Sequence, residues 1–179
     1  MKGIIFVELS EIVQEKFGHK TWNQVLQNAE PESKGVYTAA ENYSDEEADK
    51  LLNTMSAFLS KSKDEVLKLF GVHLIKAFST RFPQFFKERQ LFPFIESVEP
   101  VIHAEIKKIY SDASFPKLVT YYDGEHLMLE YHSVKKMCAL THGLIKGASY
   151  HFNEPVEIEQ CRCTHNGDDF CLFKISKKG

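Results

Sequence analysis

His103 is the residue of this chain whose type and surroundings best fit metal chemistry. It lies in the segment 99–110, which the apolar spacing predicts to be a helix with one apolar side. A neutral imidazole is a good metal ligand, and a helix holds it rigidly. The chain has eight histidines, however, and a lone helical histidine is more often a core or surface residue. His142 and His151, on a later predicted helix, compete for the same role.

About thirty residues further on, Tyr131, Ser133 and Lys135 alternate with other residues. In a strand every second side chain shares a face, so these three would line roughly 13 Å of one side. Two hydroxyl donors and an ammonium suit a pair of carboxylates. A metal ligand followed by an anion-binding strip fits haem, whereas the plain alternative is an exposed strand facing water.

The four cysteines form a second candidate metal site. Cys161 and Cys163 lie two apart in a predicted strand and would share a face, and a turn around 166–168 would place Cys163 opposite Cys171. With Cys138 approaching from the preceding helix, four soft ligands would suit tetrahedral zinc. His165 could replace one thiolate. The alternatives are small buried residues or a redox disulfide.

The first 110 residues are predicted to be helical. Ser44 with Glu47, and Ser62 with Glu65, match the capping-box pattern, and each precedes an amphipathic run. Pro100 is expected in the first turn of the His103 helix, where its missing amide hydrogen costs nothing.

Beyond residue 116 the apolar pattern changes from helical to alternating. Strands are predicted at 117–122 and 125–132 around the turn signal Asp123-Gly124, followed by a helix at 134–152 and strands at 156–163 and 170–175. The fold class is therefore α+β: a helical N-terminal subdomain and a C-terminal antiparallel sheet with a packed helix.

Length and charge exclude several classes of function. At 179 residues and 43% hydrophobic content the chain fits one domain with a sizeable core. A net charge of −3 without a basic stripe makes nucleic acid an unexpected partner. Glu8 and Glu11 interrupt the apolar start, and no stretch is apolar enough to span a bilayer. The expected location is the cytoplasm, away from membranes.

Several segments together resemble one family, the haem nitric oxide/oxygen binding (H-NOX) domain, which is also the sensor domain of soluble guanylate cyclase. His103 stands in the place of the family's proximal histidine. The other matching segments are Met1-Lys2-Gly3-Ile4-Ile5, Phe78-Ser79-Thr80-Arg81-Phe82-Pro83, Tyr131-His132-Ser133-Val134-Lys135 and Gly143-Leu144-Ile145-Lys146-Gly147. The resemblance implies one haem-binding domain over residues 1–179, with haem b between the helical and sheet parts.

The resemblance also implies which residues surround the haem. Tyr131, Ser133 and Lys135 take the place of the family's Tyr-x-Ser-x-Arg motif, and Lys135 departs from it. An ammonium keeps the charge but cannot make the two-pronged contact of a guanidinium, so propionate binding is looser here or Lys136 contributes. Pro116 resembles a proline that packs against the haem, although a proline that only opens a strand fits equally. The implied apolar neighbours are Ile5, Leu9, Leu74, Phe78, Leu140 and Leu144.

The implied function is gas sensing rather than catalysis. Oxygen-binding members carry a distal tyrosine where Leu140 stands, so nitric oxide and carbon monoxide are expected to bind and oxygen hardly at all. In the family nitric oxide weakens or breaks the iron–histidine bond, which would release the His103 helix. The implied distal positions offer no acid or base for catalysis, so an enzyme is not expected. Because the chain ends at Gly179 without an output segment, the expected partner is a separate histidine kinase or cyclic-dinucleotide enzyme.

Two further resemblances concern the cysteines. Some H-NOX members carry a zinc site such as the one proposed for Cys138, Cys161, Cys163 and Cys171. The segment Cys163–Phe173 also looks like the end of a vinyl-reductase-type domain, a zinc-containing small-molecule-binding module without haem. That module is the alternative reading of the chain.

Overall fold

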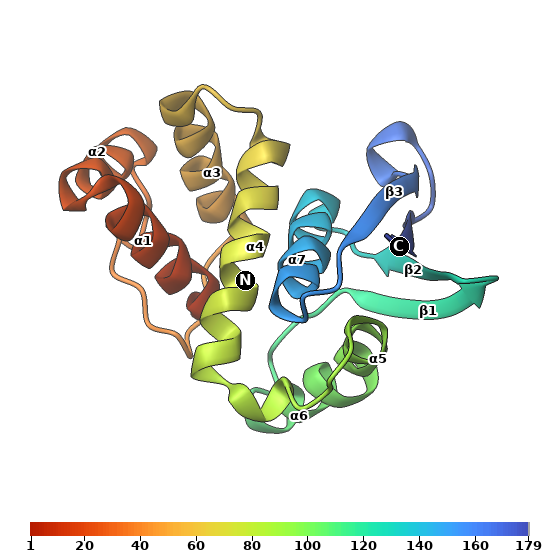
Figure 1. The fold of residues 1–179 in the computed structure, drawn as a ribbon. Coiled ribbons are helices and arrows are strands. Elements are labelled where there is room, and N and C mark those ends of the chain that lie inside the picture. The colour runs from red at the N-terminus through yellow and green to blue at the C-terminus, as the bar shows by residue number, and fades with distance from the viewer. Residues whose placement is uncertain (179) are drawn as a thin grey trace. The chain divides into compact units, whose positions relative to one another are not determined.

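The computed structural model describes residues 1–178 and divides into two compact units, which are treated separately below. The first is Met1–Phe70 and the second begins at Gly71. The first unit is helical, and the second contains an antiparallel sheet with helices (Figure 1). The predicted α+β class is confirmed. Within the described residues, no helix combines the length and apolar character needed to cross a membrane.

The first unit is built from amphipathic helices. They are α1 (Gly3–Phe17), α2 (His19–Ala29), α3 (Asp45–Leu59) and the start of α4 (Lys63–Arg81), which continues into the second unit. Gly18 has a φ of 86°, so the chain reverses between α1 and α2 at a residue without a Cβ. The buried apolar side chains of these helices include Phe6, Leu9, Val13, Trp22, Val25, Leu51, Leu52 and Met55.

The two predicted capping boxes differ in the structure. Ser62 and Glu65 form the reciprocal pair: the Glu65 amide donates to Ser62 Oγ at 3.2 Å, and the Ser62 amide donates to Glu65 Oε2 at 2.9 Å. At α3, Ser44 Oγ accepts from the Glu47 amide at 3.1 Å, but the Glu47 carboxylate does not return the bond. It accepts instead from the hydroxyls of Ser33 and Tyr37. The capping box predicted for Ser44 and Glu47 is therefore only half formed, because the Glu47 carboxylate makes tertiary hydrogen bonds in its place.

The sheet of the second unit has the strand order β1-β2-β4-β3, and all neighbours are antiparallel. Its strands are β1 (Lys117–Asp123), β2 (His126–His132), β3 (Val156–Arg162) and β4 (Cys171–Lys177). Asp123 pairs with His126 across a two-residue turn in which Gly124 has a φ of 58°. The predicted hairpin is thus present, with the glycine in the left-handed conformation that such turns require.

Helices α5 (Leu91–Ser97) and α7 (Cys138–His151) supply buried residues to the core of the second unit. The other helical segments after α4 are η1 (Pro83–Phe85), η2 (Val98–His103), α6 (Ala104–Ile109) and η3 (Thr164–Asn166). Figure 1 shows α7 alongside β3. The buried cluster includes Ile75, Leu91, Phe92, Phe94, Ile95, Leu127, Leu129, Tyr131, Ile145, Phe173 and Ile175.

Two predicted helix starts are wrong. The helix expected from residue 134 begins at Cys138, because Ser133 Oγ accepts from the Lys135 amide and Lys136 has a φ of 50°, which together form a turn. Pro100 does not open a helix. It lies inside η2, a π-helical segment that continues α5 without a break, and the wider turn accommodates a residue that has no amide hydrogen.

Glycines allow α4 and α7 to touch through their backbones within the second unit. A Cβ on Gly71 would lie 2.6 Å from the carbonyl oxygen of Leu140 and 2.6 Å from the amide nitrogen of Leu144. A Cβ on Gly147 would lie 2.9 Å from the Cα of Val72. Since backbone atoms cannot rotate away as side chains do, these glycines fix how closely the two helices approach.

Gly71→Ala should therefore destabilise the protein although alanine is the better helix former. The gain in helix propensity is about 1 kcal/mol, and overpacking typically costs about 1–3 kcal/mol, so we expect a net loss of free energy of unfolding. Urea denaturation measures this. Lys76→Ala, at an exposed position of the same helix, should change the free energy by less than about 0.5 kcal/mol. Equal stability of Gly71→Ala and the wild type would contradict the close approach.

Candidate functional site

His103 is the last residue of the π-helical segment η2, between α5 and α6. Its side chain is 13% exposed, although neither η2 nor α6 contains a fully buried residue. Short π-helical segments are rare and occur often at functional sites, where the extra residue turns a side chain relative to its neighbours. The imidazole is therefore turned inward on a stretch of helix that is only partly buried, where Val98 and Ile102 also pack against the core.

The two ring nitrogens of His103 have different surroundings. Nδ1 lies 2.9 Å from Glu99 Oε2, one helical turn earlier, and the ring stacks on Phe115 with centroids 4.3 Å apart and planes 14° apart. Among the described residues, none hydrogen-bonds to Nε2. A carboxylate beside Nδ1 favours the tautomer with the proton on Nδ1, which leaves the Nε2 lone pair for a metal.

The electrostatics of His103 also suit a neutral ligand. Burial lowers the pKa of His103 from its usual value, and the neighbouring Glu99 opposes this shift. Neutral imidazole is the form that ligates haem iron. The residues here therefore fit an axial ligand: an oriented ring, one fixed nitrogen and one available nitrogen.

The rival histidines lie in different settings. His142, on α7, is half-buried, with its ring edge against Phe173 at a centroid distance of 6.4 Å. His151, at the end of the same helix, is exposed and contacts the rings of Phe86 and Phe152. His103 is less exposed than His151, and the Glu99 carboxylate lies 2.9 Å from its Nδ1.

Tyr131, Ser133 and Lys135 lie close together, but not on one strand as expected. Tyr131 is buried in β2, which ends at His132, whereas Ser133 and Lys135 belong to the turn that leads to α7. Burial raises the pKa of Tyr131, while hydrogen bonds to its hydroxyl from Ser133 and the Met137 backbone act against that shift. The cluster is thus held by the turn and not by alternation along a strand. Lys135 is half-buried.

The implied apolar neighbours divide between the units. Ile5 and Leu9 lie one turn apart on α1 in the first unit. In the second unit, Leu74 (1% exposed) and Phe78 lie on α4, Leu140 and Leu144 lie on α7 near the contact with Gly71, and Pro116 directly precedes β1. None of these side chains carries a hydrogen-bond donor.

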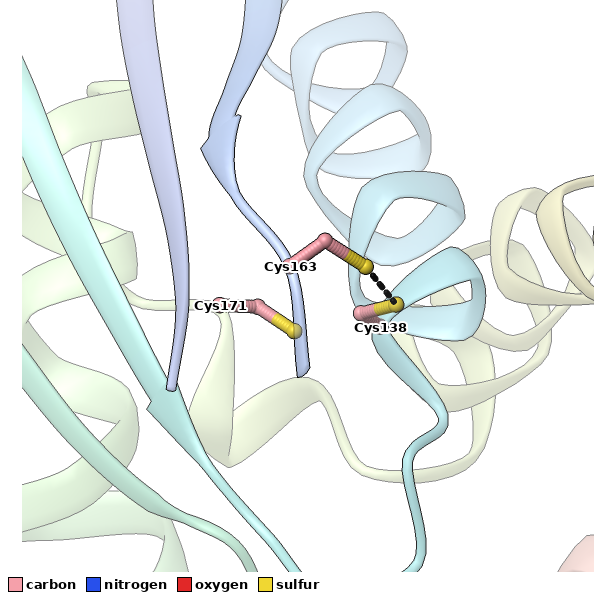
Figure 2. Close-up of side chains that lie close together, drawn as sticks. All are labelled: Cys138, Cys163 and Cys171. Carbon is pink, nitrogen blue, oxygen red and sulfur yellow. Dashed lines mark hydrogen bonds between the residues drawn. The ribbon is translucent and has the colours of Figure 1, made fainter. Parts of the chain in front are cut away.

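Three of the four cysteines come together. Cys138 at the start of α7, Cys163 after β3 and Cys171 at the start of β4 have sulfur atoms within 4.8 Å of one another (Figure 2). Cys138 Sγ and Cys163 Sγ are 3.9 Å apart. Tetrahedral zinc with sulfurs at about 2.3 Å needs a sulfur–sulfur distance of about 3.8 Å, so a small contraction would bring all three into range.

Cys161 does not join this group, contrary to the expectation that it shares a face with Cys163. The pairing of β3 with β4 shifts between Gln160 and Arg162, so Cys161 sits in the irregularity and the simple alternation is lost. Its side chain is exposed, and its sulfur lies 4.0 Å from the Glu159 carbonyl oxygen. His165, the expected substitute, bonds through Nε2 to the Lys136 carbonyl oxygen at 2.9 Å.

All four cysteines are free thiols. Burial, with the nearby Cys171 and Cys163 sulfurs, raises the pKa of Cys138 to about 12 against a weaker opposing hydrogen bond from Gln160. Cys138 is therefore protonated at neutral pH, and metal binding would have to displace its proton. The Thr164 amide donates to Cys171 Sγ at 3.3 Å, and the Cys163 amide donates to Asp168 Oδ2 at 2.8 Å, which fixes the connecting loop.

Sequence reasoning missed two residues beside His103. Glu99 is four residues earlier, a spacing that places two side chains on one helical face, and this signal was available. Phe115 is twelve residues later and not on the helix. Nothing in the sequence indicates its stacking on the imidazole.

Comparisons with known proteins identify the family of the chain. The haem-NO-binding family matches residues 2–160. The chain is similar to an H-NOX protein from S. oneidensis solved in the Fe(II)NO ligation state, with 28% identity, a TM-score of 0.94 and 100% coverage of both chains. It is also similar to the Fe(II) unliganded H-NOX protein from K. algicida, with 31% identity, a TM-score of 0.90 and coverage of 100% of this chain and 97% of that one.

A third similar structure is an NMR structure of an H-NOX domain from Shewanella oneidensis in the Fe(II)CO ligation state. Its identity is 28%, its TM-score 0.90, and the coverage is 100% of this chain and 99% of that one. No curated protein matches the chain. The match to the family over most of the sequence favours the haem reading over the vinyl-reductase-type alternative. This chain therefore belongs to the haem-NO-binding, or H-NOX, family of haem-based gas sensors.

Proposed function

We propose that residues 1–179 work as one sensor domain that binds haem b through His103 and detects nitric oxide and carbon monoxide. The observation that carries this proposal is the setting of His103, whose Nδ1 faces Glu99 while Nε2 has no partner among the described residues. Tyr131, Ser133 and Lys135 are proposed to bind the propionates, and Pro116 to pack against the haem. Ferrous haem supplies the gas-binding iron, and the protein supplies ligand, orientation and surroundings.

The gas preference is proposed from the chemistry of the apolar residues. Leu74, Phe78, Leu140 and Leu144 contain no donor that could stabilise the negative charge on bound dioxygen. Nitric oxide does not need such a donor. Ile5 and Leu9 on α1 are assigned to the same apolar surroundings by the family resemblance. The proposed sensor therefore discriminates against oxygen by lacking a hydrogen bond.

Signalling is proposed to proceed through release of His103. The segments η2 and α6 contain no fully buried residue, but Val98 and Ile102 of η2 pack against the hydrophobic cluster, so release of His103 would be transmitted to the core. The proposed receiver is a separate histidine kinase or cyclic-dinucleotide enzyme, and the domain itself acts as a sensor and not as an enzyme. The difference in free energy between the state with His103 bound to iron and the state with His103 released would determine how far the gas shifts the population of the two states.

For the cysteines we propose a zinc site with three protein thiolates. Cys138, Cys163 and Cys171 supply them, and the short distance between the first two sulfurs supports the geometry. The fourth position is open to water or to Cys161 if the strand irregularity rearranges. Such a site would join α7 to β3 and β4.

The first prediction concerns the axial ligand. His103→Gly should lower haem affinity and alter the ferrous Soret spectrum, because the protein loses its iron ligand, and added imidazole should restore the spectrum. Absorption spectroscopy of purified, haem-reconstituted protein measures this. His142→Ala is the matched control and should keep the wild-type spectrum. A wild-type spectrum for His103→Gly without imidazole would move the ligand role to His142.

The second prediction concerns selectivity. Ferrous wild-type protein in air should keep the spectrum of its anaerobic unliganded form, whereas nitric oxide should shift the Soret band to that of haem without a histidine ligand. Leu140→Tyr should raise oxygen affinity by adding a hydrogen-bond donor. Leu140→Phe, of similar size but without the hydroxyl, should not. A persistent oxygen spectrum in the unmodified protein would refute the apolar argument.

The third prediction concerns zinc. Freshly purified, reduced protein should contain about one zinc per chain, measured by metal analysis. Cys138→Ala, Cys163→Ala and Cys171→Ala should each lower the occupancy strongly, while Cys161→Ala should retain most of it because that thiol lies outside the cluster. The Soret band should persist in all four. If the protein contained no zinc and all four thiols were readily alkylated, the zinc proposal would be wrong and the cysteines would be small packing residues.

A further inference from the structure

Glu99 makes two contacts through one carboxylate oxygen. Oε2 lies 2.9 Å from His103 Nδ1 and accepts a hydrogen bond from the Leu118 amide at 3.3 Å. The first contact lies within η2, and the second reaches β1, nineteen residues further along the chain. One oxygen atom therefore ties the imidazole to the edge of the sheet.

This arrangement has a chemical and a mechanical consequence. A carboxylate that accepts from Nδ1–H raises the electron density of the ring and makes Nε2 a stronger donor to a metal. Because the same oxygen is held by Leu118, the ring is also oriented relative to β1. Phe115 restricts the ring from its face, at a centroid distance of 4.3 Å.

A purely structural role does not explain why Glu99 contacts the His103 ring. The helix is already tied to β1 by Glu96 Oε2, which accepts from the Tyr122 hydroxyl at 3.1 Å. This bond lies one turn before Glu99 and does not touch His103. If tethering alone were required, Glu96 would supply it, whereas Glu99 places its oxygen on the ring nitrogen.

We infer that Glu99 is a positioning residue that fixes the Nδ1–H tautomer of His103 and strengthens the bond from Nε2 to the iron. Only the part of this inference that concerns the bond to iron rests on the proposed haem function. The tautomer is a property of the chain without haem. Glu99 then sets how readily the His103 bond yields when a gas binds on the iron, since a weaker donor is released more easily.

The first arm of the test uses haem-free protein. Nitrogen-15 NMR of labelled histidine should show His103 in the Nδ1–H form in the wild type. Glu99→Gln keeps an acceptor oxygen and should keep this tautomer, whereas Glu99→Ala should shift the population toward Nε2–H. Unchanged tautomer populations in Glu99→Ala would overturn the inference whether or not the protein binds haem.

The second arm uses ferrous haem-loaded protein. Resonance Raman spectroscopy should show the iron–histidine stretching frequency falling from wild type to Glu99→Gln, which loses the charge, and further to Glu99→Ala, which loses the bond. Haem transfer to excess apomyoglobin should be about ten- to a hundredfold more favourable for Glu99→Ala. Identical frequencies in the three proteins would overturn the inference.

The matched control is Glu96→Gln. It weakens the neighbouring tie to β1 without touching His103, so a loosened helix alone should leave both tautomer and stretching frequency at wild-type values. If Glu96→Gln lowered the frequency as much as Glu99→Gln, Glu99 would be structural and the inference wrong. Failure of the wild type to bind haem would contradict the proposed function and leave the NMR arm to decide the role of Glu99.

Discussion

Burial of one face of the sheet is the constraint on which the second unit depends. The register pairs Leu127 with Ile175 and Leu129 with Phe173, and all four are at most 2% exposed. Directly opposed residues on one face pack as a unit, and each such side chain contributes about 1.5–3 kcal/mol by leaving water. Helices α5 and α7 cover this face with the apolar residues of the same cluster. Both candidate sites are attached to this core.

The His103 site lies at the margin of the core. Four residues of α5 are fully buried and none in η2 or α6 is, but Val98 and Ile102 of η2 still pack against the hydrophobic cluster. Polar contacts with β1 are made by Glu96 of α5 and Glu99 of η2. Hydrogen bonds of this kind contribute roughly 1 kcal/mol each, less than the burial of a large apolar side chain. The hydrogen bonds through Glu99 therefore orient His103 more than they stabilise the fold.

The cysteine cluster and the proposed propionate-binding residues lie at the same end of the sheet as the Glu99 contact, because Leu118 pairs with Tyr131 in the register of β1 and β2. Tyr131 pairs directly with Cys171 in the register of β2 and β4, and Cys138 begins the helix that follows the Ser133–Lys135 turn. The irregularity in β3 removes Cys161 from the four-cysteine cluster that the sequence predicts. One displaced residue is enough to turn Cys161 into solvent, because side chains in a strand alternate between faces.

The sequence by itself determined the α+β class, the hairpin at Gly124, the capping box of Ser62 and Glu65, and the haem-NO-binding family. These depend on local chemistry: the period of apolar residues, turn residues that tolerate a positive φ, and short motifs. Tertiary structure decided the rest. The Glu47 carboxylate accepts from Ser33 and Tyr37 and not from the Ser44 amide, Phe115 stacks on His103, and Cys161 lies outside the cluster. Each of these outcomes depends on a partner distant in sequence or on a register shift, and local pattern contains no information about either.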